Sequence, residues 1–131
     1  MSFKDLLTVL TTYPKPTPVS AVDEAVDLAS ELGAKISAIA CEVKIKAPGS
    51  PLGSYLLDIP AMVAAENKKS ATNAQQLLAA FQDVAEKRGV FQERISEECL
   101  TSEVPEVLIE YCRLRDLAVV PLPEGNFFDQ W

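Results

Sequence analysis

Few residues of this chain have the chemistry that catalysis requires. The sequence contains no histidine, which removes Ser-His-Asp and Cys-His catalysis, phosphohistidine chemistry and the commonest metal ligand. Its three cysteines, Cys41, Cys99 and Cys112, each lie in an apolar run and lack C-x-x-C spacing. That placement argues against a disulfide framework and a thiolate zinc site, and it is typical of thiols that pack as small apolar groups.

Acidic residues are the remaining candidates, because metal-assisted phosphate chemistry needs carboxylates clustered at the ends of strands. Glu42, near the end of an apolar run, is the one acid in a suitable place. Asp5 and Asp116 precede predicted strands, so they should lie at the opposite rim of a sheet. The turn-forming loop at residues 47–54 lacks the Gly-Lys-Ser/Thr ending of a phosphate-binding P-loop. The sequence therefore predicts a protein that is not an enzyme.

The amino-terminal third of the chain has the pattern of a strand–helix–strand unit, around which the rest of the fold is organised. An apolar run at residues 6–10 is followed by a proline-broken polar loop, an amphipathic helix between Ser20 and Gly33, and a second apolar run at residues 35–43. Two strands joined through a helix must be parallel. Ser20 and Asp23 have the spacing of a capping box at the start of this helix.

The rest of the chain continues the alternation of helices and strands. Residues 61–87 predict one long helix or two abutting ones, and residues 90–100 predict an exposed edge strand. Ser102 is expected to cap a third helix, and residues 117–120 predict a fourth strand that is apolar on both faces. Together these elements predict a single α/β domain over residues 1–131, an open parallel sheet with helices on both faces.

The net charge and the hydropathy of the sequence limit the classes of partner that the chain is expected to bind. The 131 residues carry a net charge of −7, which disfavours binding to a nucleic-acid backbone. The amino terminus lacks a basic region followed by a long apolar core, and no apolar stretch approaches the roughly 20 residues that span a bilayer. We therefore expect a soluble, cytoplasmic protein without nucleic-acid or membrane partners.

The order strand–helix–strand–loop–helix–strand–helix–strand resembles the universal stress protein family across most of the chain. The resemblance includes the Leu-Gly-Ala sequence at residues 32–34 and the Arg-Asp-Leu-Ala-Val-Val sequence at residues 115–120. It implies the adenine nucleotide alpha hydrolase-like fold, with a parallel sheet in the order 3-2-1-4-5. Members of the family commonly dimerise. Many of them bind ATP between the ends of strands one and four, and others bind no nucleotide.

The sequence differs from the ATP-binding members at two places that affect whether it can bind a nucleotide. Thr11 and Thr12 stand where those members usually carry an aspartate, and a Pro-Leu-Pro-Glu-Gly sequence at residues 121–125 replaces their glycine-rich phosphate motif. The two prolines have no amide donors, and the glutamate repels phosphate. Binding of ATP or AMP is therefore disfavoured, and we expect no cofactor and no metal.

The chain also stops where the family's fifth strand and last helix would begin. The expected order is then 3-2-1-4 with the fifth strand missing, and the apolar fourth strand forms an open edge. We expect either that a second copy covers this edge in a homodimer, or that the chain is the first half of a longer tandem protein. Phe127, Phe128 and Trp131 are candidate interface anchors, and the alternative is that they fold back over their own sheet.

Ligands of open parallel sheets bind outside the carboxyl ends of the strands, where the strand order reverses. The candidate crevice residues are Thr11, Thr12, Pro121 and Leu122, and the resemblance adds Val43 as a contact to a ligand ring. The alternative role for all of them is loop packing. We expect a non-catalytic domain that acts in the stress response through dimerisation or small-ligand sensing. The alternative is a nucleotide-binding or nucleotide-hydrolysing enzyme of the same α/β class.

Overall fold

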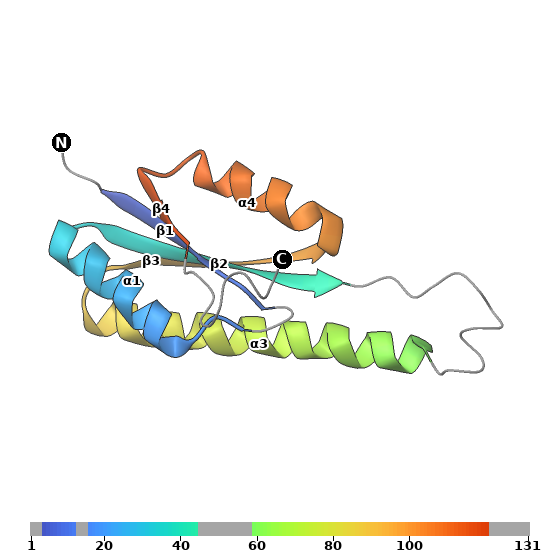
Figure 1. Cartoon of the computed structure of the whole chain (residues 1–131). Helices are drawn as coiled ribbons and strands as arrows, with labels where there is room; N and C mark the ends of the chain where they lie inside the picture. The colour runs from blue at the N-terminus through green and yellow to red at the C-terminus, as the bar shows by residue number, and fades with distance from the viewer. Residues whose placement is uncertain (1–3, 13–15, 45–58, 121–131) are drawn as a thin grey trace, which may run out of the picture.

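The chain forms a four-stranded parallel sheet with helices on both faces (Figure 1). The computed structural model describes residues 4–12, 16–44 and 59–120. In chain order, its elements are β1 (Asp5–Leu10), α1 (Val19–Leu32), β2 (Lys35–Lys44), α3 (Ile59–Lys87), β3 (Phe91–Leu100), a 3-10 turn η1 (Thr101–Glu103), α4 (Val104–Cys112) and β4 (Leu117–Val119).

The strands lie in the order β3-β2-β1-β4, which confirms the predicted order of the four strands. Every pairing is parallel, and Leu6 of β1 stands opposite both Ile36 of β2 and Leu117 of β4. Parallel neighbours need crossover connections, which α1, α3 and α4 supply. Among the described residues β3 and β4 are the two edges of the sheet, as the sequence predicts.

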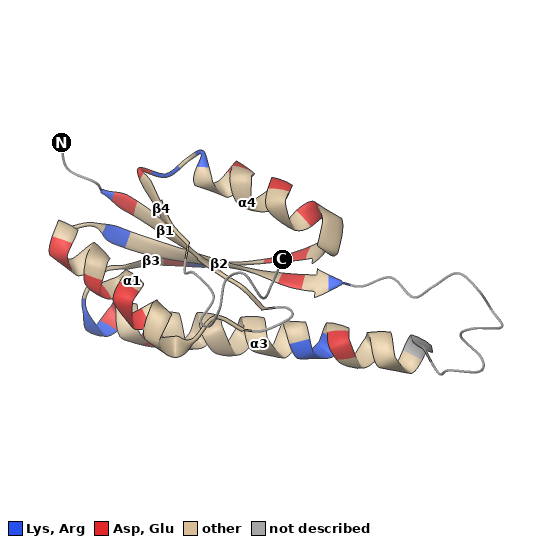
Figure 2. Ribbon diagram, in the orientation of Figure 1, with Lys and Arg blue, Asp and Glu red and all other residues tan. Residues whose placement is uncertain are grey.

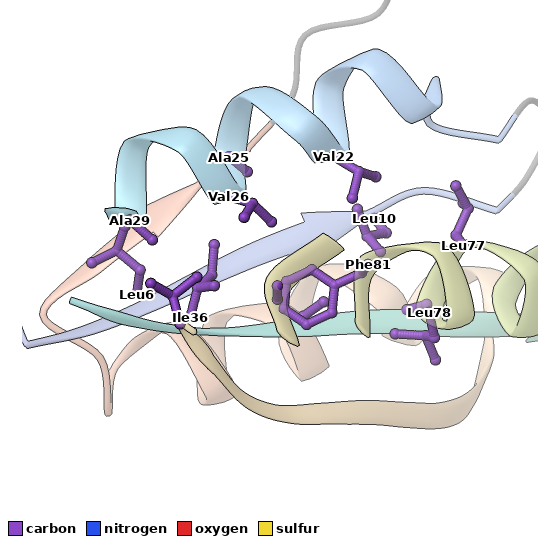
Figure 3. Close-up of a cluster of buried hydrophobic side chains, with 14 of the residues drawn as sticks. Leu6, Leu10, Val22, Ala25, Val26, Ala29, Ile36, Leu77, Leu78 and Phe81 are labelled. Carbon is purple, nitrogen blue, oxygen red and sulfur yellow. The ribbon is translucent and has the colours of Figure 1, made fainter. Parts of the chain in front are cut away.

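Alternation along β1 divides the core into two layers. Leu6 and Leu10 face α1 and α3, whereas Leu7 and Val9 face α4. The larger layer lies between the sheet and the helices α1 and α3, and Figure 3 shows its side chains pointing into that space. Phe81 of α3 is fully buried there. The whole of β1 after its first residue is buried, so β1 is the covered central strand.

β4 is less covered than its apolar sequence suggests. Ala118 is exposed, and Leu117 and Val119 are half-buried. Within the described part of the chain, β4 pairs with β1 alone. The apolar residues of this strand therefore reflect contact with one neighbour and with the core layers, and not enclosure between two strands.

Glycines end the two longest helices, as predicted. Gly33 after α1 and Gly89 after α3 have φ angles of +67° and +72°, in the left-handed region that glycine adopts without strain. α3 is one continuous helix of 29 residues, which decides between the two predicted alternatives. No described helix combines the length and the apolar character that crossing a membrane demands.

The predicted capping box at the start of α1 is wrong. The helix begins at Val19, one residue before Ser20, and no side chain caps it. The carbonyl of Pro18 accepts the N–H of Ala21 at 3.0 Å and so closes the first turn. Because proline already holds the helical φ angle, the helix can start directly after it, and Asp23 lies beyond the first turn.

The predicted cap at Ser102 is also wrong. Ser102 lies within η1, and α4 begins at Val104 with Pro105 in its first turn. The carboxylate of Glu103 accepts the N–H of Leu100 at 2.9 Å. A side chain three residues farther along thus binds the backbone where β3 ends, and the turn leads directly into the helix.

One buried hydroxyl in β1 weakens the core. Thr8 is fully buried, and its hydroxyl has no hydrogen-bond partner among the described residues. Replacing Thr8 with valine should raise the free energy of unfolding by about 1 kcal/mol, because the branched shape is kept and an unpaired buried donor is removed. Urea unfolding measures this change.

Thr17 supplies a matched control for this substitution. It is also buried, but its hydroxyl accepts a backbone hydrogen bond from Thr11 at 2.8 Å. Thr17→Val should therefore lower the free energy of unfolding, opposite in sign to Thr8→Val. A loss of stability in Thr8→Val would contradict the unpaired state of its hydroxyl.

Candidate functional site

The sequence predicts a crevice outside the carboxyl ends of β1 and β4. On the β2 side of that edge of the sheet, the described residues hold a buried pair of hydroxyls. The hydroxyl of Thr12 donates to the carbonyl oxygen of Cys41 at 2.6 Å. The hydroxyl of Ser70, from α3, lies 2.8 Å from that of Thr12 and accepts the N–H of Val43 at 2.9 Å. Because the single hydroxyl proton of Thr12 goes to Cys41, Ser70 must donate to Thr12.

These bonds join three elements through two side chains. Thr12 and Ser70, which we call the buried hydroxyl pair, are 3% and 1% exposed. Asn73, also from α3, donates from its side-chain amide to the carbonyl oxygen of Thr12 at 3.1 Å. The pair therefore holds the end of β1 against β2 and α3. Neither hydroxyl proton is left to bind a ligand.

Thr11, the exposed neighbour of Thr12, closes the loop that follows β1. Its N–H donates to the hydroxyl of Thr17 at 2.8 Å, and the N–H of Thr17 donates back to the carbonyl oxygen of Thr11 at 2.9 Å. The two hydroxyls lie 3.0 Å apart. This reciprocal pairing fixes the two ends of a short loop, which is the packing role that the sequence left as an alternative.

The structure thus brings Thr12 and Val43 together through Ser70 and places Thr11 beside them. The other two predicted crevice residues, Pro121 and Leu122, lie outside the described residues, as do the predicted interface anchors Phe127, Phe128 and Trp131.

Sequence reasoning missed Ser70 and Asn73. Ser70 precedes Ala74, Leu77 and Leu78 at helical spacing, so it lies on the buried stripe of α3. A polar residue on an otherwise apolar stripe was the available signal, because a buried hydroxyl needs a partner. The partners themselves come from distant parts of the chain and leave no local pattern.

Glu42, the one acid predicted near this edge, contacts uncharged side chains in the part of the chain that the structure describes. Its carboxylate oxygen Oε1 accepts from the amide of Gln75 at 3.2 Å and from the hydroxyl of Ser96 at 3.4 Å. Across residues 4–12, 16–44 and 59–120, no cluster of three cysteine, aspartate or glutamate side chains can hold a metal ion. Glu98 stands opposite Glu42 on β3, but two carboxylates without a third metal-binding side chain fall short of the clusters that phosphate chemistry uses.

Charged residues gather instead at the opposite edge, where β1 and β2 begin (Figure 2). The guanidinium of Arg115 donates from Nη1 to Asp5 at 3.0 Å and to the hydroxyl of Ser37 at 3.2 Å, and from Nη2 to Glu93 at 2.8 Å. One side chain thus links β1, β2 and β3. Burial lowers the pKa of Arg115, but the hydrogen bonds to Glu93 and Asp5 outweigh it and raise the pKa overall.

Asp116 completes this amino-terminal edge. Its carboxylate oxygen Oδ2 accepts the N–H groups of Lys4 at 2.9 Å and Asp5 at 3.1 Å. The two acids that the sequence places at this rim, Asp5 and Asp116, are therefore engaged in holding β1 to the start of β4. The prediction that they lie away from the crevice is confirmed.

The cysteines pack as apolar groups and not as nucleophiles. Cys41 and Cys99 are buried, and Cys112 of α4 is half-buried. Burial, followed by the hydrogen bond with Cys99, raises the pKa of the Cys41 thiol from 9.0 to about 12. The thiol stays protonated at neutral pH, and a protonated thiol is a poor nucleophile.

A hydrogen bond between Tyr111 and Glu97 joins α4 to β3 next to these thiols. The phenol of Tyr111 donates to Oε1 of Glu97. This hydrogen bond, with burial as the second cause, raises the pKa of Tyr111 above its usual value. The contact attaches the helix to the edge strand.

Comparison with solved structures finds proteins that share this fold. A universal stress protein family structure from Burkholderia pseudomallei is 21% identical, with a TM-score of 0.61, over 92% of this chain and 82% of that one. A universal stress protein in complex with cAMP is 16% identical, with a TM-score of 0.50, over 99% and 82% of the two chains. No family model matches the sequence, and no curated protein sequence matches it either.

The chain has the universal stress protein fold. The likeness extends over nearly all of this chain and most of each of these two relatives, and it includes the sheet whose strand order the sequence predicts. At these identities the likeness concerns the fold. Thr12 of the buried hydroxyl pair lies at the point where the resemblance places an aspartate in the ATP-binding members.

Proposed function

We propose that this chain is a non-catalytic domain of the universal stress protein type. It acts in the stress response, in the cytoplasm, by pairing with a second copy of itself or by sensing a small ligand other than ATP. The proposal rests on the sequence resemblance together with the fold that the chain shares with universal stress proteins.

The observation that carries the proposal is the engagement of the crevice hydroxyls. A hydrolase or phosphotransferase needs a nucleophile, a base or a metal at the carboxyl ends of the strands. Here the protons of Thr12 and Ser70 go to the carbonyl of Cys41 and to Thr12, and Glu42 belongs to no cluster of three metal-binding side chains among the described residues. These groups support structure and offer little to a reaction.

The nucleotide preference is testable with the full chain. One relative of the fold is a complex with cAMP, so a panel of cAMP, ATP, ADP and AMP covers the relevant ligands. A ligand at 100 times its dissociation constant stabilises a protein by about 2.7 kcal/mol, which for a chain of this length raises the melting temperature by roughly 10 °C. We expect no increase with ATP, ADP or AMP, and we expect a dimeric mass in light scattering.

Substitution of Glu42 tests the alternative that the chain is an enzyme. Metal-dependent hydrolysis of ATP that is lost in Glu42→Gln and kept in Glu98→Gln would establish the enzyme alternative. Glu98 is the matched control because it stands opposite Glu42 on β3 and is exposed. A chain that is monomeric and whose melting temperature no panel ligand raises would equally contradict the proposal.

A further inference from the structure

An apolar pocket lies on the α4 side of the sheet, away from the crevice. Its volume is about 500 Å³, within the range of small-molecule sites. Val9 of β1 forms part of the floor, Val120 lies at the end of β4, and α4 forms the wall. Its lining among the described residues is Val9, Pro105, Leu108, Ile109, Cys112, Arg113 and Val120.

The pocket exists because the two faces of the sheet are covered unequally. α1 and α3 cover one face, and α4 is the helix on the other face in the described part of the chain (Figure 1). Ile109 is 55% exposed and Val120 is 59% exposed, although both line the pocket. Apolar surface of this kind gains free energy when another apolar group covers it.

The best-placed group to cover it is the chain's own continuation. Residues 121–131 follow directly from Val120, and they include Leu122, Phe127, Phe128 and Trp131. An extended chain spans about 3.5 Å per residue, so Phe127 can lie up to ~25 Å from Val120. That reach exceeds the length of α4, about 14 Å for nine residues.

The charge of the pocket lining and the effective concentration of a tethered segment also favour residues 121–131 as the occupant of the pocket. Arg113 is the one charged residue of the lining in the described part of the chain, and residues 121–131 carry two acids, Glu124 and Asp129, and no base. A tethered segment also has an effective concentration in the millimolar range, above that of any free competitor in a dilute solution. A second copy of this chain, with a net charge of −7, would meet charge repulsion as well.

We propose that the apolar pocket between α4 and the β1–β4 side of the sheet is the docking site of residues 121–131, with their aromatic side chains as the anchors. The segment then covers apolar surface on this face of the sheet, as α1 and α3 cover the other face.

Trp131 is the only tryptophan of the chain and reports on docking without a label. In the full chain its fluorescence should lie at shorter wavelength than in urea, and acrylamide should quench it less. Ile109→Lys places a charge in the pocket and should shift the emission to that of the unfolded chain. Val19→Lys is the matched control, because Val19 is 54% exposed on α1, and it should change nothing.

The alkylation rate of Cys112, which lines the pocket, gives a second measure of docking. Phe127→Ser combined with Phe128→Ser should speed alkylation of Cys112 by roughly tenfold, as expected for a site that docking keeps closed about nine-tenths of the time. Mass spectrometry distinguishes Cys112 from the buried Cys41 and Cys99.

Three results would overturn the proposal. The first is a Trp131 emission that already matches the unfolded chain. The second is an emission, or a rate of Cys112 alkylation, that these substitutions leave unchanged. The third is a Trp131 emission that shifts on dilution, because a second copy would then be the occupant of the pocket.

Discussion

Truncating Phe81 to alanine should lower the free energy of unfolding by about 3–5 kcal/mol, a large share of the roughly 5–15 kcal/mol that stabilises a typical domain. Phe81 is fully buried between the sheet and the helices α1 and α3 (Figure 3). Removing its ring leaves a cavity that the surrounding side chains fill only in part. Chemical denaturation of the purified chain measures the loss.

Phe91 is the control for this prediction. Its ring lies 5.9 Å from that of Phe81 at an angle of 52°, but Phe91 is half-buried on the edge strand β3. Phe91→Ala should therefore lower stability by about 1–2 kcal/mol. Because the rings touch, the double substitution should depart from the sum of the single effects. Equal losses at the two positions would contradict the burial that sets them apart.

Replacing Ser70 with alanine should lower the free energy of unfolding by about 2–3 kcal/mol. The substitution removes the acceptor for the N–H of Val43 and the donor to Thr12, and it leaves both groups buried without partners. Denatured-state effects are small for a serine-to-alanine change, so the loss should appear in the midpoint of urea unfolding with an unchanged slope.

Two comparisons make this prediction specific. Ser20→Ala should change stability by less than about 0.5 kcal/mol, because Ser20 is exposed inside α1 and caps nothing. Thr12→Val combined with Ser70→Ala should show a coupling energy of about 1 kcal/mol or more in a double-mutant cycle. Additive effects of these two substitutions would mean that the buried hydroxyl pair does not act as a unit.

The fold was predictable because its signals are local. Apolar runs at regular intervals, with amphipathic helices between them, fix a parallel sheet, and a glycine after each long helix marks where it ends. The order 3-2-1-4 came from the resemblance, and the pairing of Leu6 with Ile36 and Leu117 agrees with it. Periodicity and helix stops depend on neighbours within a few residues, which a sequence displays directly.

The site was harder to predict because its bonds connect distant residues. Thr12 was named as a ligand contact, yet its hydroxyl is committed to Cys41 and its partner Ser70 comes from the middle of α3. The guanidinium of Arg115 binds Asp5 and Glu93 on two strands far from it in the sequence. The predicted capping of α1 by Ser20 was wrong for a different, local reason, because the helix starts directly after Pro18.

The central place of β1 also bears on how the protein is made. β1 is made before both of its neighbours, and Leu6 of β1 pairs with Ile36, which follows soon after it in the chain, and with Leu117, which follows much later. During synthesis one side of a strand whose residues are almost all apolar therefore waits without a partner until β4 emerges. An unpaired apolar strand edge is prone to mispairing, so the nascent chain is exposed to aggregation, and to capture by chaperones, until β4 has been made.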